Sequence, residues 1–148
     1  HSKRSSGNYS FTGDKDGSDN LEQIATFLET NSTDDTETAD NYPTFYFAKN
    51  YASQEGSHVT GTAYANGWYL PSIAELFQLV KNRATVNAAS ALCGGSQFKD
   101  NTFYWSSSAY VSGYTYNYAY RLKVATSAIC YPDTKSNANS YTCAICEF

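Results

Sequence analysis

The stretch that determines the fold reads GWYLPSIAELFQLVKNRATVNAASALCGG and spans residues 67–95. It opens with a short apolar strand that ends at Pro71. Ser72 and Glu75 follow with the spacing of a capping box, in which each side chain accepts a hydrogen bond from the backbone of the other residue. The apolar residues beyond this cap recur at helical spacing, so we expect a helix with one buried face. That face consists of Ile73, Leu76, Phe77 and Val80.

A second helix is expected soon after the first. Asn87 is a suitable N-cap, and small and apolar residues then run to about Cys93. The two glycines that follow would end this helix, because glycine readily adopts the left-handed conformation found after helices. A cysteine in this position is expected to fill a small buried space. Capping accounts for the Ser and Glu of the preceding box, and we assign no catalytic role to either.

The chain is long enough for one domain. Residues 1–10 contain neither an initiator Met nor an apolar signal core, and we interpret them as a leader or cloning remnant. Residues 11–148 are expected to form a single domain around one core. No apolar run approaches the roughly 18 residues that would span a bilayer. Any membrane attachment would then depend on an anchor upstream of this chain.

Asp19 and Glu22 predict a further capping box, at the start of a helix near the N-terminus. Asp14, Asp16 and Asp19 also resemble part of a calcium-binding loop. That motif needs a glutamate where this chain has Ala25, so we favour the cap.

Two segments before the central stretch differ in character. Residues 29–41 are polar and acidic without periodicity, which is typical of an exposed loop. Residues 43–51 fit two structures. Phe45 and Phe47 alternate as in a strand, whereas Pro43 suits the first turn of a helix.

The C-terminal third is expected to form strands. Residues 104–121 read YWSSSAYVSGYTYNYAYR, and they hold six of the chain's 14 tyrosines. Further strands are expected around residues 128–131 and 141–148. Tyr interleaved with Ser, Gly and Asn is typical both of a recognition surface and of a tyrosine-rich sheet. Alternation places one set of side chains on a common strand face. This set is Tyr116, Tyr118, Tyr120, Leu122 and Val124.

The charge distribution argues against nucleic acid as a partner. The net charge is −4 over 148 residues, and the tyrosine-rich end is close to neutral. Neither half carries the basic stripe that a phosphate backbone requires. Anionic membrane surfaces are disfavoured for the same reason.

The order of the motifs resembles a known family. GWYLPSIAEL, NRATVNAASALCGGSQ, FYWSSSAY and YAYRLKV are similar to the bacterial domain of unknown function 1566 and its relatives in the formylglycine-generating-enzyme branch of the C-type lectin fold. The lead-in TGDKDGSDN and YPTFYFA resemble spirochaetal variable proteins diversified by a retroelement, of the treponeme variable protein A kind. The resemblance covers roughly residues 11–148.

This resemblance implies an α+β fold of the C-type lectin, formylglycine-generating-enzyme type. Two main helices would pack on small twisted antiparallel sheets, and residues 43–51 would be helical. A C-terminal variable region at about residues 104–148 would display the ligand-binding surface. Relatives commonly have arginines where this chain has Cys143 and Cys146, which leaves open whether the last strand keeps the polar contacts of the family.

The function implied is that of a non-catalytic ligand-binding protein, diversified by a diversity-generating retroelement. Its partner would be a protein or other macromolecular ligand on a host or neighbouring cell. It would act as a monomer without a cofactor, secreted or at the cell surface on a lipid-anchored parent protein. Tyrosine anchors and adaptable polar residues would form the ligand contacts. The candidates are Tyr110, Tyr114, Tyr116, Asn117, Tyr120, Arg121, Tyr131, Asp133, Asn137 and Asn139.

The genetic code is consistent with such a variable region. Variation of AAY codons cannot produce Lys, Gln, Glu, Met or Trp, and none of these five occurs between Ala109 and Tyr120. Trp105 would therefore be invariant. It could border the site or belong to the core.

The cysteines and histidines indicate neither metal binding nor catalysis. Cys143 and Cys146 would point to opposite faces of a strand, so we expect them neither to bridge nor to share a metal. We expect a free surface thiol at Cys130. Outside the leader, His58 stands alone, and no nucleophile has a matching base.

Two other functions fit parts of the sequence. One is a carbohydrate-binding lectin or adhesin module of fixed sequence, in which tyrosine rings stack on sugars and the Asp14 loop or Asp133 holds calcium. The other is a structural assembly domain whose tyrosines pack against a neighbouring domain.

Overall fold

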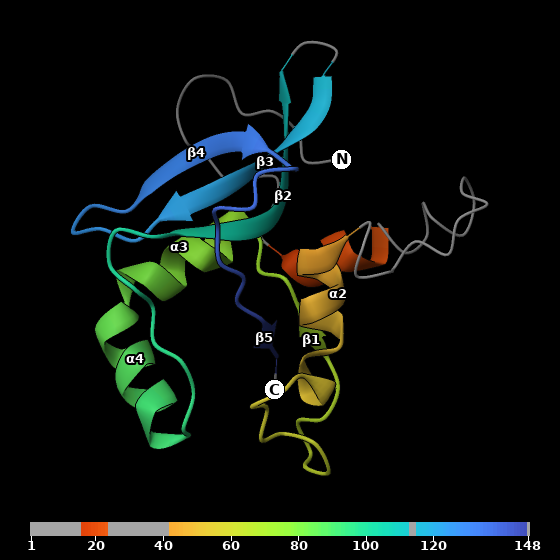
Figure 1. Cartoon of the computed structure of the whole chain (residues 1–148), viewed down its shortest axis with the longest axis vertical. Helices are drawn as coiled ribbons and strands as arrows, with labels where there is room; N and C mark the ends of the chain where they lie inside the picture. The colour runs from red at the N-terminus through yellow and green to blue at the C-terminus, as the bar shows by residue number, and fades with distance from the viewer. Residues whose placement is uncertain (1–15, 24–41, 113–114, 148) are drawn as a thin grey trace.

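The computed structural model describes residues 16–23, 42–112 and 115–147, which form an α+β arrangement with small antiparallel sheets (Figure 1). The α+β class predicted from the sequence is thereby confirmed. Residues 17–23 are helical. The elements that follow are α2 (Pro43–Lys49), the 3-10 turn η1 (Tyr51–Ser53), β1 (Trp68–Tyr69), α3 (Ile73–Lys81), α4 (Arg83–Leu92), β2 (Phe103–Ser112), β3 (Thr115–Lys123), β4 (Ile129–Thr134) and β5 (Ile145–Cys146).

The strands form two sheets. β2, β3 and β4 make an antiparallel sheet in that order, and β1 pairs with β5 in a two-stranded one. Figure 1 shows α3 against the larger sheet, with α2 beside β1. Among the described residues, no helix is both long and apolar enough to cross a membrane.

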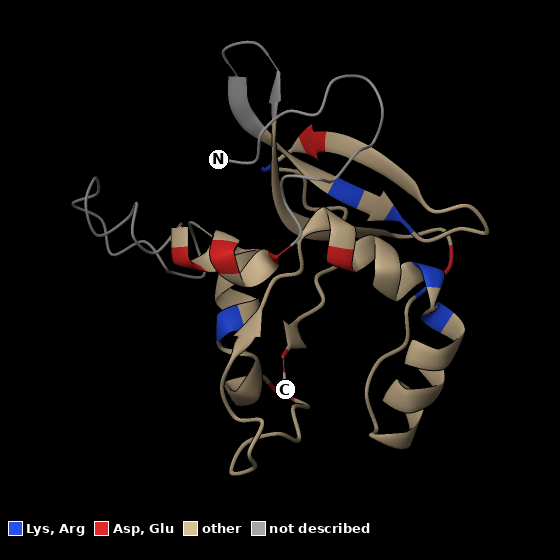
Figure 2. Ribbon diagram, turned by 180° about the vertical axis from the view of Figure 1, so that it is seen from behind, with Lys and Arg blue, Asp and Glu red and all other residues tan. Residues whose placement is uncertain are grey.

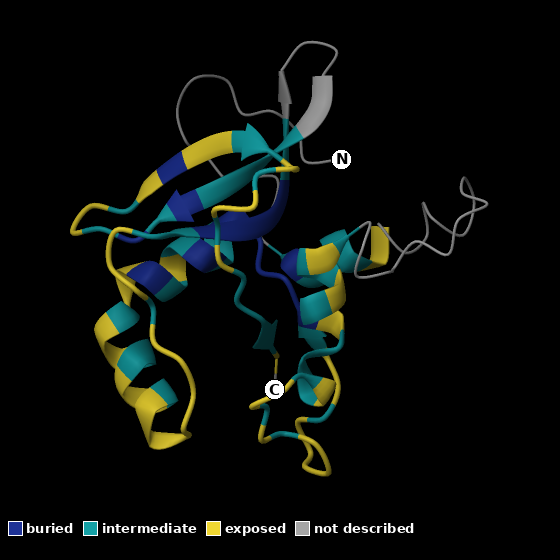
Figure 3. Cartoon of the chain, in the orientation of Figure 1, coloured by how far each residue is buried: buried dark blue, intermediate teal, exposed yellow. Residues whose placement is uncertain are grey.

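Helix α3 has the start that its sequence predicts. Ser72 Oγ accepts a hydrogen bond from the Glu75 backbone at 3.3 Å, and the Glu75 carboxylate accepts one from the Ser72 backbone at 2.8 Å. The helix packs on the larger sheet and forms the centre of the core (Figure 3). The buried cluster comprises Ile73, Leu76, Val80, Tyr104, Leu122, Val124 and Cys130, with Phe77 packed against it.

A run of buried serines joins β2 to the start of α3. Ser106, Ser107 and Ser108 lie where the β2–β3 register shifts between Trp105 and Ala109. Ser108 Oγ accepts a hydrogen bond from the Ile73 backbone at 2.8 Å. Hydrogen-bonded partners offset the cost of burying these hydroxyls, so the irregularity in β2 is a packing feature.

Helix α4 starts earlier than predicted. It runs from Arg83, so Asn87 lies inside it, and the Asn87 side chain instead bonds the backbone of Phe98. The expected glycine end is confirmed. Gly94 has φ +71°, and Gly95 N–H donates to Ser90 O at 2.8 Å.

The first helix also starts earlier than predicted. Asp16 precedes it, and its carboxylate accepts a hydrogen bond from the Ser18 backbone at 2.9 Å. Asp19 lies one turn further on, inside the helix and exposed, so its predicted role as N-cap was wrong. Asp14 and residues 29–41 lie outside the described residues.

The predictions for residues 43–51 and for the last strand have different outcomes. The helix favoured for residues 43–51 is confirmed as α2, with Pro43 in its first turn. The last strand is shorter than expected, because only Ile145 and Cys146 pair with β1. Tyr141, within the same expected strand, makes an isolated parallel bridge to Tyr104.

Candidate functional site

The predicted ligand-binding residues that the structure places on strands lie on two faces of the β2–β3–β4 sheet. Residues paired across an antiparallel sheet point to the same side, so the register assigns each residue a face. The inner face is the side of Leu122, toward α3. The outer face is the opposite side, and it carries Phe103, Arg121, Lys123, Ile129, Tyr131 and Asp133.

Tyrosines extend the inner face beyond the core. Tyr110 pairs with Tyr118, and its ring meets those of Tyr118 and Tyr120 edge to face, with centroids 6.2 and 5.3 Å away. All three residues are half-buried, and Tyr120 also packs against the core. Tyr110 and Tyr120 are thus brought together as predicted candidates, in a cluster that includes Tyr118. Such rings offer apolar area and hydroxyls at little rotational cost.

Three other candidates are not placed by the structure. Tyr114 lies outside the described residues. Tyr116 and Asn117 belong to β3, but their side chains are also outside the described part of the chain. Trp105 is placed, and at 6% exposure it is buried.

The polar candidates meet on the outer face. Arg121 forms an ion pair with Asp133, and its side chain is only 15% exposed. Its guanidinium lies over the ring of Phe103, 4.0 Å from the centroid, which is a cation–π contact. Arg121 also donates a hydrogen bond to Ser140 Oγ at 3.2 Å. Adjacent to it, the rings of Phe103 and Tyr131 meet edge to face at 5.7 Å.

The loop after β4 closes onto this ion pair. Asn137 Nδ2 donates to the Asp133 carboxylate at 2.8 Å, and the Asn139 backbone donates to Asn137 Oδ1 at 2.8 Å. A backbone bond from Asn137 to Thr134 O makes the turn itself. Arg121, Asp133, Asn137 and Asn139, all predicted ligand contacts, therefore lie together in the structure. Their polar atoms, however, contact one another.

Sequence reasoning missed Tyr141, which stacks on the ring of Tyr104 and is 46% exposed, with the Lys99 ammonium 4.7 Å from its ring centroid. It also missed two participants on the outer face, since Phe103 stacks under Arg121 and Ser140 accepts a hydrogen bond from Arg121. Period-two spacing from Trp105 could have placed Phe103 on this face. Ser140 carried no such signal, because it lies in a loop, which has no periodicity.

The exposed part of the outer face is aromatic and weakly charged. Tyr131 is 40% exposed and Ile129 is 42% exposed. Lys123 Nζ lies 5.9 Å from the Phe103 centroid, beside the paired Arg121 and Asp133. Figure 2 shows the basic residues of the described chain spread over several elements. This arrangement suits contacts with a mixed polar and aromatic surface.

The cysteines differ from their predictions. Cys93, expected to be buried, is exposed at the end of α4, because the helix ends on its solvent side. Cys130, expected on the surface, is 6% exposed, because it pairs with Leu122 on the inner face. Burial raises the pKa of the Cys130 and Cys143 thiols to about 12. All four cysteines are free, so Cys143 and Cys146 do not bridge, as predicted.

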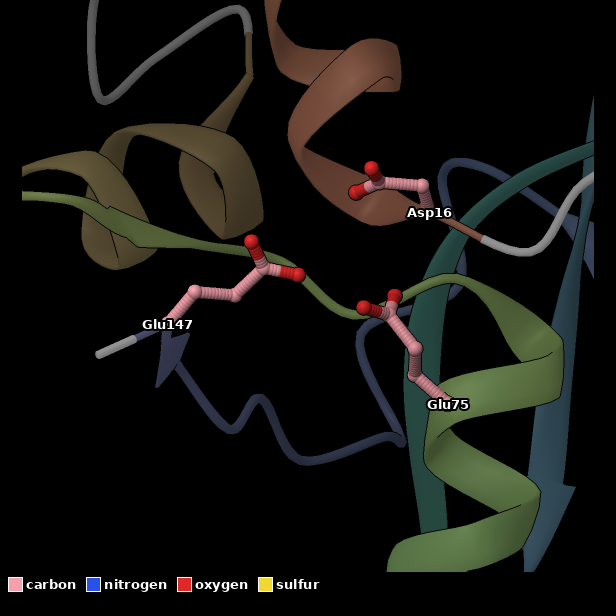
Figure 4. Close-up of side chains that lie close together, drawn as sticks. All are labelled: Asp16, Glu75 and Glu147. Carbon is pink, nitrogen blue, oxygen red and sulfur yellow. The ribbon is translucent and has the colours of Figure 1, made fainter.

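Three carboxylates meet where three chain segments converge (Figure 4). Asp16, Glu75 and Glu147 each have an oxygen within 4.8 Å of the others. Carboxylate oxygens are ligands that calcium accepts. Both Glu75 oxygens already accept hydrogen bonds, from the backbones of Gly17 and Ser72 and from the hydroxyl of Tyr69. These bonds account for the position of Glu75, and we assign no metal to the cluster.

Tyr69 connects this cluster to the core. Its hydroxyl donates to Glu75 at 2.9 Å and lies 3.3 Å from a Glu147 oxygen. Burial raises the pKa of Tyr69 far above its ordinary value, and the hydrogen bonds and negative charges of Glu75 and Glu147 raise it further. The phenol is therefore a hydrogen-bond donor here.

Comparison with protein-family models, curated proteins and solved structures found no match for this chain.

Proposed function

We propose that this chain is a non-catalytic ligand-binding domain of the C-type lectin fold, diversified by a retroelement. It binds a protein or other macromolecular ligand of a host or neighbouring cell, acts as a monomer and needs no cofactor. Its parent protein is secreted or held at the cell surface by a lipid anchor. The ligand meets the variable surface formed by the β2–β3–β4 sheet and the loop after β4.

One observation carries this proposal. The placed candidates form two groups, one on each face of the same sheet, although they come from separate stretches of sequence. Tyr110 and Tyr120 cluster on the inner face, and Tyr131 is exposed beside the Arg121–Asp133 pair on the outer face. Rigid aromatic anchors beside adaptable polar groups are the usual composition of binding surfaces.

The same geometry weakens the calcium-dependent lectin alternative. The Asp133 carboxylate is occupied by Arg121, Asn137 and the Thr134 backbone. Asp16 caps a helix, and Asp14 lies outside the described residues. A calcium ion at Asp133 would have to displace a cation and two hydrogen-bond donors.

Diversification is tested at the gene. We expect a reverse transcriptase and a template repeat beside it, with mismatches to the codons for residues 104–148 confined to template adenines. A locus without a template repeat would contradict the retroelement part of the proposal.

Ligand binding is tested by substitution. Alanine replacement of Tyr110 through Asn117 should abolish cross-linking of the protein to intact host cells and leave its melting temperature nearly unchanged. Cross-linking should persist when the exposed Leu92, at the far end of α4, is replaced by alanine. A loss of folding in the first variant would show that these residues belong to the core.

A further inference from the structure

The ion pair on the outer face does more than neutralise two charges. The Arg121 guanidinium makes contacts in three directions, with Phe103 below it, Asp133 across from it and Ser140 beyond the turn. At 15% and 21% exposure, neither partner of the pair is a surface charge. An arginine presents its donors in a fixed planar fork, so these contacts define one orientation of the group.

Residues 133–140 comprise the end of β4 and the loop after it, and this segment is hydrogen-bonded or ion-paired to the Arg121 group at both ends. Asp133 holds its start, through the Thr134 backbone and Asn137 Nδ2. Ser140 holds its end, through Arg121. Asn137 closes the middle by accepting a hydrogen bond from the Asn139 backbone. Asp133, Asn137 and Ser140 are half-buried, while Lys135, Ser136 and Asn139 are exposed.

We propose that Arg121 and Asp133 are positioning residues of the binding surface and not ligand contacts. They clamp residues 133–140 into one conformation, and the exposed side chains around the clamp meet the ligand. This inference rests on the proposed function for the existence of a ligand, and on the contacts above for the clamp. Because Arg121, Asp133 and Asn137 interact with one another, a substitution at any of them changes the conformation of residues 133–140 as well as the side chain itself.

Lys123 offers a matched control. It is the next cation on the same face of β3 and lies 5.9 Å from the ring of the same Phe103. No contact between Lys123 and residues 133–140 is present in the described part of the chain. Lys123→Ala therefore removes a charge from this surface and leaves the clamp intact.

The clamp is tested by amide hydrogen exchange. Arg121→Gln should raise exchange at Asn137 and Asn139 by about tenfold or more, the factor that corresponds to one lost charge-assisted hydrogen bond. Ser140→Ala, which removes one acceptor and no charge, should raise it less, and Lys123→Ala should leave it unchanged. Exchange at the Ser107 amide, which bonds Pro71, should not change in any variant. Unchanged exchange at Asn137 and Asn139 in Arg121→Gln would overturn the clamp.

Should Arg121→Gln unfold the protein, Ser140→Ala and Arg121→Lys decide the matter. Lysine keeps the charge but has no planar fork. Arg121→Lys should therefore keep the ion pair with Asp133 and lose the hydrogen bond to Ser140. We therefore expect Arg121→Lys to behave like Ser140→Ala, with amide exchange at Asn137 and Asn139 faster than in the wild type and slower than in Arg121→Gln. Full protection in both variants would overturn the proposal.

A display experiment separates the clamp from the binding function. Tyr131, Lys135, Ser136 and Asn139 are randomised on phage in the wild-type and Arg121→Gln backgrounds and selected against streptavidin as the probe. Binders from the wild-type background alone would support the positioning role. Equal yields from both backgrounds would overturn it. Failure of both libraries together with the predicted exchange pattern would support the clamp and contradict the binding function.

Discussion

Gly17 shows how closely the first helix approaches the centre of the fold. A Cβ at this residue would lie 2.2 Å from Leu70 O and 2.7 Å from Ser72 N. Both atoms belong to the backbone between β1 and α3, which cannot move without disturbing the capping box at Ser72. Glycine is therefore required here for space.

We predict that Gly17→Ala destabilises the protein by about 1–3 kcal/mol, the usual cost of overpacking. Urea denaturation of the variant measures this directly. Gly61→Ala measures a different cost, the strain of φ +77° at a site with nothing within 4 Å. A Gly17→Ala variant as stable as the wild type would show that the close approach of Gly17 does not matter.

The thiols should differ sharply in reactivity. Cys93 is exposed, whereas Cys130 is buried and its pKa is raised to about 12. Since the thiolate is the reactive species, we predict that a thiol reagent at pH 8 labels Cys93 rapidly and Cys130 only on unfolding. Peptide mapping of the labelled protein measures both rates. Comparable labelling of Cys130 in the native protein would contradict its place on the inner face.

The capping box of α3 is the element on which the rest of the fold depends. Ser72 is fully buried, and its partner Glu75 also holds Gly17 and Tyr69. We predict that Ser72→Ala costs about 1 kcal/mol, as for other helix caps. Glu75→Gln should cost more, because it weakens three hydrogen bonds to a charged acceptor. Thermal unfolding would measure both, with Gln78→Ala on the exposed side of α3 as the control.

Local signals were sufficient for some elements and insufficient for others. The box at Ser72 and the glycine end at Gly94 were predicted, since each involves residues within one or two turns. Asn87 was misassigned as a cap because its partner, Phe98, is eleven residues away. The length of β5 was mispredicted for the same reason, because it is set by pairing with Trp68, which is distant in sequence.

The candidate site follows the same rule. Alternation was enough to put Tyr120 and Arg121 on opposite faces of β3. It could not show that Arg121 would be occupied by Asp133 and Ser140, because those contacts need the register of β4 and the path of a loop. The structure shows that Arg121 and Asp133 contact each other, and their predicted contact with a ligand stays a prediction.

At the scale of the molecule, the buried phenol of Tyr69 links segments that are far apart in the sequence. Its hydroxyl lies between the carboxylates of Glu75 on α3 and Glu147 after β5, and Glu75 also accepts a hydrogen bond from the Gly17 backbone in the first helix. Figure 4 shows the three carboxylates of this junction pointing toward one another. Because the phenol donates hydrogen bonds to carboxylates, the junction depends on its proton.

We therefore predict loss of stability at alkaline pH. Folding raises the pKa of Tyr69, and it raises that of Cys130 from 9.0 to about 12, so the folded state holds these protons more tightly than the unfolded state. Their contribution to the free energy of unfolding is fully present below the pKa values of the unfolded chain and is lost as pH rises above about 9.

Urea denaturation between pH 7 and 11 should show a free energy of unfolding that is flat to about pH 8 and then falls. Tyr69→Phe should have lower stability at pH 7 but a shallower decline, because it removes one titrating group along with its hydrogen bonds. A wild-type free energy that stays constant to pH 11 would contradict the protonated, buried state of both groups.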